Sequence, residues 1–292
     1  MPQFKDFSTD QIKKIQAERL RQVAFIRPEV EVLQIGEGEH AFRIIPPLAE
    51  ETWTDSFFLT AGTHWLGKSI LCPRSIPALG QDCPVCQEFF ERRKRGELPQ
   101  ELRGLKPVYR HLIWVWYFPL DGRQPPNHPH VYPCPDTLLD SILRAAQDRI
   151  TKALIPFLDP QRGRLVMFTR TGTGLNTRYV NVALDQNELP VPEEVLGQVR
   201  LWKDTLVVPS QEELEAALED YLARAEPGAV IDEQQHAEGD IPTASTQQVT
   251  PQSSTTQADS GGATITQEAT EDNLDAIRLR IQEMRQRMQG NG

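Results

Sequence analysis

One histidine and three of the four cysteines in this chain lie within a segment of 23 residues, HWLGKSILCPRSIPALGQDCPVC. The segment contains His64, Cys72, Cys83 and Cys86, separated by seven, ten and two residues. Structural zinc sites use four nitrogen or sulfur ligands in a tetrahedral arrangement, and a Cys-x2-Cys turn can present two thiolates to one ion. We therefore predict one zinc ion at these four residues. Because four protein ligands leave no coordination position for water, its role would be structural.

Other interpretations of the thiols remain open. A thioredoxin-like redox pair also places Cys-x2-Cys before a helix, but it gives Cys72 and His64 no role. The thiols could also be unligated, and Cys134 could replace His64 as the fourth ligand. His64 is preferred because the segment then closes on its own metal. The chain starts with charged residues and no apolar run follows, so we expect no secretion signal, no membrane span and no disulfide framework.

The elements around this segment are predicted from hydrophobic periodicity and turn residues, and they indicate a mainly β chain with helices. Asp136 is the expected N-cap of one helix, and Ser210 with Glu213 forms a capping box that opens another. Gly96 is expected to end the helix that follows the cysteines. Strands are expected at 30–35, 40–45, 55–61, 108–120 and 128–134, a hairpin at 163–184, and helices at 8–25, 83–96, 135–155 and 210–225.

A strand rich in aromatic residues, VYRHLIWVWYFPL, is the second feature with possible chemistry. Its alternation places Arg110, Trp114 and Trp116 on one face, where indoles beside a cation could stack unpaired bases. The strand could instead be buried on both faces. Arginine with aromatics on strands favours single strands over duplex readout. The candidate DNA-binding residues are Lys106, Arg110, Trp114, Trp116, Arg170, Arg178 and Tyr179.

Charge is distributed unevenly along the chain, whose formal net charge is −10. Between Arg224 and Arg278 there are ten acidic residues and no lysine or arginine. Residues 226–270 are also rich in Ser, Thr and Gln, which predicts a disordered acidic linker. Residues 271–292 carry an apolar stripe with 3-4-3-4 spacing, which predicts a short amphipathic helix that docks on a partner. TGTG at 171–174 is typical of a hairpin tip, and we predict no enzyme.

Taken together, the order of the strands, the His-Cys-Cys-x2-Cys insertion, VYPCPDTLLDSIL and GRLVMFTRTGTGLNTRYV resembles the single-stranded DNA-binding (helix-destabilising) proteins of T-even bacteriophages. The resemblance covers about residues 30–185. It implies an OB-fold core at 29–225 with a zinc subdomain inserted at about 62–106, and an N-terminal helical arm at 1–28 for cooperative self-association. It also implies that the acidic C-terminal tail recruits replication and recombination proteins, and that the protein acts in the cytoplasm of an infected bacterium.

The function expected from these features is sequence-independent coating of single-stranded DNA in phage replication, recombination and repair. Basic side chains would follow the phosphates, so the affinity would fall with salt, and aromatic faces would stack bases. The alternative is a zinc-bearing adaptor that recruits a replication or transcription partner through its C-terminal helix. Salt-sensitive binding to a homopolymer such as oligo-dT distinguishes the two, because an adaptor should show none.

Overall fold

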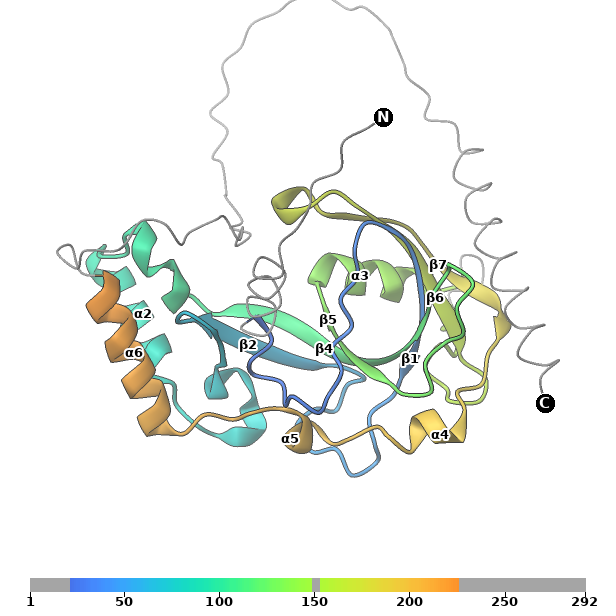
Figure 1. The fold of residues 1–292 in the computed structure, drawn as a ribbon, viewed down its shortest axis with the longest axis horizontal. Coiled ribbons are helices and arrows are strands. Elements are labelled where there is room, and N and C mark those ends of the chain that lie inside the picture. Colours follow the sequence, from blue (N-terminus) through green and yellow to red (C-terminus); the bar gives the residue numbers. More distant parts are fainter. Residues whose placement is uncertain (1–21, 149–152, 226–292) are drawn as a thin grey trace, which may run out of the picture.

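The computed structural model describes residues 22–148 and 153–225 (Figure 1). Most of the predicted N-terminal arm (1–28) lies outside the described residues, as do the whole predicted acidic linker (226–270) and the predicted C-terminal helix (271–292). None of the helices among the described residues is long and apolar enough to cross a membrane.

Seven strands form one sheet in which every strand-to-strand ladder is antiparallel. Their order is β3-β2-β4-β1-β6-β7, and β5 pairs with β4. The chain is thus a mixed α/β fold, and the strand at 30–35 is replaced by an isolated bridge between Val32 and Val131. The strands are β1 Gly38–Ile45, β2 Leu59–Trp65, β3 Ser69–Leu71, β4 Val108–Phe118, β5 His130–Cys134, β6 Arg164–Thr171 and β7 Arg178–Glu188.

The strand β4 is the branch point of the sheet because it pairs with three strands. β5 occupies one edge from His111 to Val115. On the other edge β1 pairs from Trp114 onward, where Ile45 is the partner of Trp114, and β2 pairs up to Leu112. β1 and β2 therefore lie end to end along the same edge of β4. Five of the strands follow the order β5-β4-β1-β6-β7, and β2 with β3 extends beyond them at the start of β4.

The helices are short and their ends follow the local sequence. Gly96 has φ of 75° and ends α2, as predicted, since glycine adopts this left-handed conformation without steric cost. The predicted capping box is confirmed, because Ser210 Oγ accepts a hydrogen bond from the Glu213 amide at 3.2 Å and Glu213 Oε2 accepts one from the Ser210 amide at 2.8 Å. The helices are α2 Pro84–Arg95, α3 Asp136–Ala145, α4 Glu193–Leu196, α5 Trp202–Thr205 and α6 Gln211–Ala225, with 3-10 turns η1 Pro73–Ser75, η2 Pro77–Leu79, η3 Gln100–Leu105 and η4 Gly174–Asn176.

Two expectations about helix α3 were wrong. Asp136 is its first helical residue rather than the N-cap, which is Pro135, and the Asp136 carboxylate lies 2.7 Å from His111 Nε2 on β4. The helix also ends at Ala145 instead of continuing to 155. Gln147 forms a bridge with Leu154 there, so the backbone turns back on itself.

Both faces of the sheet are buried. One face, with Phe42, Ile113 and Phe168, packs against α3, which Figure 1 shows lying within the curve of the strands between β5 and β7. The opposite face, with Trp114 and Trp116, is covered by residues 22–32 and by the segment 189–208 that contains α4 and α5. This covering segment was not predicted from the sequence.

A third apolar cluster lies apart from the other two, at the end of the molecule formed by β2, β3, α2 and η3. Helix α6 belongs to this cluster, because Leu214 is buried in it and Leu218, Tyr221 and Leu222 pack against it. Figure 1 shows α6 running beside α2, away from β6 and β7. The prediction grouped α6 with the core domain, whereas the structure joins it to the inserted segment. We call β2, β3, α2, η3 and α6 the metal module.

A buried arginine on β1 forms hydrogen bonds with two segments that are far away in the chain. Arg43 has no exposed surface, and its guanidinium donates hydrogen bonds to the carbonyl oxygens of Leu189 at 3.0 Å, Phe157 at 2.6 Å and Ile44 at 2.8 Å, and also to that of Asp159. Gly163 lies against the guanidinium, and a Cβ atom there would be 1.8 Å from Nη2. Glycine at position 163 is therefore what leaves room for the arginine head group.

Candidate metal centre

The four predicted ligands come from three elements of the metal module. His64 is on β2, opposite Ile70 of β3, and Cys72 follows β3 directly. The amide of Cys72 donates a hydrogen bond to Gly62 at 2.8 Å, which holds this residue against β2. Cys83 immediately precedes α2, and Cys86 is in the first turn of this helix, after a proline that suits the first helical position. Local backbone structure thus directs all four side chains to one point.

The four side chains converge with the geometry of a tetrahedral site. Cys72 Sγ and Cys86 Sγ are 3.5 Å apart, and His64 Nε2 is 3.5 Å from the sulfurs of both Cys83 and Cys86. Zinc bonds of about 2.3 Å to sulfur and 2.0–2.1 Å to nitrogen, at tetrahedral angles, separate ligand atoms by roughly 3.5–3.8 Å. All four residues are buried. The cluster could therefore hold a metal ion such as zinc.

The imidazole of His64 is oriented by a second hydrogen bond. Its Nδ1 lies 2.8 Å from the carbonyl oxygen of Leu105, the last residue of η3. A carbonyl can only accept, so Nδ1 donates this hydrogen bond, and Nε2 faces the sulfurs of Cys83 and Cys86. Ligating histidines in metalloproteins commonly use their other ring nitrogen in this way.

The thiols of the cluster shift each other's pKa values in opposite directions, which favours a bound cation. Hydrogen bonds from Cys72 and Cys86 lower the pKa of the Cys83 thiol, whereas hydrogen bonds with Cys83 and Cys86, together with burial, raise the pKa of Cys72. Without a cation, a thiolate at Cys83 thus depends on protonated neighbours. A bound divalent ion removes this conflict, because thiolates are its preferred ligands and it offsets their charge.

The alternatives for the thiols fit the structure less well. All four cysteines are free rather than paired in disulfides. Cys134 is buried in the apolar cluster around α3, with its sulfur 3.6 Å from the Pro135 carbonyl, and it is not part of the His64 cluster. It is therefore not the fourth ligand. A dithiol pair alone leaves unexplained why His64 and Cys72 point at the same centre.

Sequence reasoning overlooked one motif in this region. Residues 62–69, GTHWLGKS, match the P-loop pattern G-x4-G-K-S. A P-loop requires a strand, a glycine-rich turn and then a helix. Here Gly67, with φ of 85°, instead forms the turn of the β2–β3 hairpin, and Ser69 begins β3. No helix N-terminus follows to bind a phosphate, so the match carries no nucleotide-binding role.

The predicted stacking surface at Trp114 and Trp116 does not fit their burial. Their exposed fractions are 3% and 5%. Trp114 stacks on Trp202 of α5 with ring centroids 5.6 Å apart, and the Trp116 indole donates a hydrogen bond to the Pro126 carbonyl at 2.6 Å. The indole faces are therefore core packing surfaces, covered by the segment 189–208, and a base cannot reach them in this structure.

The other predicted DNA-binding residues lie in two groups. Lys106 is exposed at the end of η3 and Arg110 is half-buried near the start of β4. Arg170 and Tyr179 are directly opposite each other near the tip of the β6–β7 hairpin, and Arg178 is exposed beside them. Arg170 also donates a hydrogen bond to the Ile35 carbonyl at 2.6 Å. Because Arg170 pairs with Gly38, beyond the Phe118 end of β4, the two groups lie at opposite ends of the sheet.

The exposed aromatic side chains lie on the metal module and at the start of β4 beside it, instead of on the middle of β4. Tyr109 is 48% exposed and Phe90 is 39% exposed. The guanidinium of Arg74 lies over the Phe90 ring, 5.4 Å from its centroid. Tyr109 is the second residue of β4, before the buried part of the strand begins. This position at the start of the strand was the signal that could have distinguished it from the tryptophans.

Comparison with known proteins adds no further assignment. No protein-family model matches this sequence, and no curated protein matches it significantly.

Proposed function

We propose that this protein binds single-stranded DNA through an OB-fold core, and that a zinc ion at His64, Cys72, Cys83 and Cys86 has a structural role. The observation that carries the proposal is the strand order β5-β4-β1-β6-β7, with α3 between β5 and β6 in the sequence. This is the order of an OB-fold's strands 3-2-1-4-5, opened between the third and fifth strands. OB-folds are partly open Greek-key barrels, and α3 lies at that opening.

The position of the predicted DNA-binding residues supports the same reading. OB-folds bind oligonucleotides with the face of strands 2 and 3 and with the loops between strands 1 and 2 and strands 4 and 5. In this chain the part of the metal module from β2 to η3 is inserted between β1 and β4, the equivalent of the first loop. The tip of the β6–β7 hairpin is the equivalent of the second. Lys106 and Arg110 belong to the first region, and Arg170, Arg178 and Tyr179 to the second.

Tyr109 replaces the tryptophans as the proposed base-stacking residue. It is exposed at the start of β4, close in the chain to Lys106 and Arg110. Base stacking on an exposed aromatic ring contributes about 1–3 kcal/mol per base. Lys106 and Arg110, which precede and follow Tyr109 in the chain, would neutralise the phosphates on either side of a stacked base.

We expect labelled oligo-dT to bind with an affinity that falls steeply with salt. Each phosphate contact contributes roughly 0.7 to the slope of log affinity against log salt for a single strand. Lys106→Ala and Arg178→Ala should each weaken binding and reduce this slope by about one contact, and Tyr109→Ala should weaken binding by roughly 5–150-fold. Fluorescence anisotropy of the labelled DNA is the suitable measurement, because three of the five tryptophans are buried in the core.

Arg162→Ala is the matched control for these variants, because Arg162 is an exposed arginine paired with Glu188 at 3.2 Å, at the opposite end of β7 from Arg178. Its affinity and salt slope should equal those of the unaltered protein. Absence of any salt-sensitive binding by a folded, metal-loaded protein would contradict the proposal and favour the adaptor function.

Deletion of residues 229–292 is expected to tighten binding to oligo-dT several-fold at low salt. The deleted part contains ten acidic and four arginine side chains, and a negatively charged segment competes with DNA for basic residues. The difference between the two proteins should shrink as salt is raised, because screening weakens this competition. Equal affinities at low salt would show that the acidic segment does not compete, and would leave partner recruitment as its proposed role.

A further inference from the structure

A second group of metal-binding side chains lies at the other end of β5 from Cys134. His130 begins β5 and His128 precedes it by two residues. Residues 31–33 run alongside, since the Val131 amide donates a hydrogen bond to the Glu31 carbonyl and the Leu33 amide donates one to the Val131 carbonyl, both at 2.9 Å. These backbone hydrogen bonds fix Glu31 next to the two histidines, although it is about a hundred residues away in the chain.

The three side chains meet at one carboxylate oxygen. Glu31 Oε2 is 3.0 Å from His128 Nε2 and 3.4 Å from His130 Nε2, and the two rings have centroids 4.8 Å apart. Metal bonds of about 2.0–2.2 Å to imidazole nitrogen and carboxylate oxygen separate such ligand atoms by roughly 2.9–3.5 Å for angles between 90° and tetrahedral. Glu31 Oε2 is therefore already at metal-ligand spacing from both nitrogens, and the three donor atoms all lie within 4.8 Å of one another.

Each of the two histidines has a buried ring nitrogen that lacks a hydrogen-bond partner among the described residues. His128 Nε2 and His130 Nδ1 are both buried, and among the described residues neither has a hydrogen-bond partner of good geometry, although the first is within ion-pair distance of Glu31. Buried polar atoms are nearly always hydrogen-bonded in folded proteins. A metal ion shared by Glu31 Oε2 and the two Nε2 atoms would give His128 Nε2 a partner.

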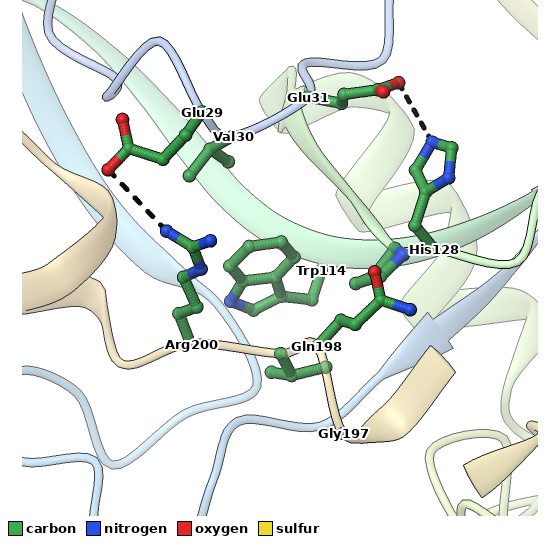
Figure 2. Close-up of a pocket in the computed structure, with 10 residues that line it drawn as sticks. Glu29, Val30, Glu31, Trp114, His128, Gly197, Gln198 and Arg200 are labelled. Atoms are coloured by element: carbon green, nitrogen blue, oxygen red, sulfur yellow. Dashed lines mark ion pairs between the residues drawn. The ribbon is translucent and has the colours of Figure 1, made fainter. Parts of the chain in front are cut away.

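Space for further ligands is present beside the cluster. An open pocket of about 460 Å³ lies there. Figure 2 shows Glu31 and His128 on one side of it and Trp114, Gln198 and Arg200 on others. An ion pair of 3.6 Å between Glu29 and Arg200 crosses it. Water or a small ligand in this pocket could reach an ion at Glu31 and His128.

We propose that Glu31, His128 and His130 form a second metal site, for an exchangeable divalent transition metal such as Zn²⁺, Co²⁺ or Ni²⁺. Imidazole and carboxylate donors suit these ions, and three protein ligands leave coordination positions for water. The ion would link residues 29–33 to β5 and so hold this segment against the sheet. The proposal is independent of DNA binding and of the cysteine site.

Cobalt distinguishes the two sites by their ligands. Protein whose cysteine site is filled with zinc is titrated with Co²⁺, and bound metal is counted by equilibrium dialysis with elemental analysis. We expect a second equivalent of metal per chain, whose visible spectrum has weak d–d bands and lacks the intense thiolate-to-cobalt charge-transfer band that cobalt at a cysteine site produces. The ion should also raise Tm, because it binds only the folded chain.

Glu31→Gln and His128→Asn should each weaken the second equivalent at least tenfold, since even outer-shell changes cost 10–100-fold in metal affinity, and both should keep one zinc. Glu29→Gln is the matched control: it removes a carboxylate from the same pocket and should leave the second equivalent and the rise in Tm intact. The proposal is overturned if the unaltered protein saturates at one equivalent, or if Glu31→Gln and His128→Asn bind the second equivalent as tightly as Glu29→Gln.

Discussion

Replacement of a single sulfur at the cysteine site, Cys83→Ser, is expected to remove the metal and unfold the metal module. The zinc that remains after dialysis has removed exchangeable metal should fall from about one per chain to near zero. The reasons are that a serine hydroxyl is a poor zinc ligand and that structural zinc contributes roughly 10–16 kcal/mol of apparent binding free energy at neutral pH. The apolar cluster there is small and includes the cysteines themselves. Without the ion, α2 and α6 lose the centre on which they pack, so helical circular dichroism should decrease.

Cys134→Ser is the matched control for this substitution. It also places a hydroxyl at a buried cysteine, but it should retain a full equivalent of zinc, because Cys134 lies in the cluster around α3. Elemental analysis of the two purified proteins, with limited proteolysis to locate the unfolded segment, is the measurement. Retention of zinc by Cys83→Ser, or its loss from Cys134→Ser, would show that the ligand set is wrong.

The second large effect is expected at Arg43, where Arg43→Met should lower the free energy of unfolding by roughly 3–5 kcal/mol. Methionine has a similar length but no donors, so the buried carbonyls of Phe157 and Leu189 lose their partner, and each unsatisfied group costs about 1–3 kcal/mol. Burial lowers the pKa of the guanidinium to about 10, so it remains charged at neutral pH and its hydrogen bonds are charge-assisted.

Urea and thermal unfolding of Arg43→Met measure this loss, and Tm should fall by about 10 °C for a domain of this size. Arg200→Met is the control, because the Arg200–Glu29 ion pair is exposed and such pairs contribute about 0–1 kcal/mol. Arg43→Lys should be intermediate, since lysine keeps the charge but cannot reach several carbonyls with one planar group. If Arg43→Met were as stable as Arg200→Met, the hydrogen bonds of Arg43 would not hold β1 to its neighbours.

The metal centre could be predicted from the sequence because its information is local. The ligand types and their spacing within one segment are typical of few kinds of site other than a zinc site. The backbone needs only a hairpin and the start of a helix to bring Cys72, Cys83 and Cys86 together. The strand β4 was predictable for a similar reason, since its composition and alternation are properties of consecutive residues.

What the sequence could not supply is which distant segment covers each face. The alternation of β4 correctly placed Trp114 and Trp116 on one face, but their burial depends on Trp202 and the segment around it. Periodicity shows that a face is apolar without showing its partner. Arg43 was missed for the same reason, since an arginine is buried only where a remote residue, here Gly163, leaves space for it. The cluster of Glu31, His128 and His130 likewise depends on a pairing of residues far apart in the chain.

The packing of α6 on the metal module determines where the C-terminal part of the chain is attached. Tyr221 of α6 donates a hydrogen bond to the Glu101 carbonyl at 2.6 Å and accepts one from the Gly104 amide at 3.1 Å, within the same η3 turn whose last carbonyl bonds to His64. Loss of the ion would therefore release α6, and its 15 residues would add about 50 Å of extended chain to whatever follows Ala225. A metal ion at this cluster would thus control how far the acidic C-terminal segment can extend, so chelation should change the distances over which that segment acts.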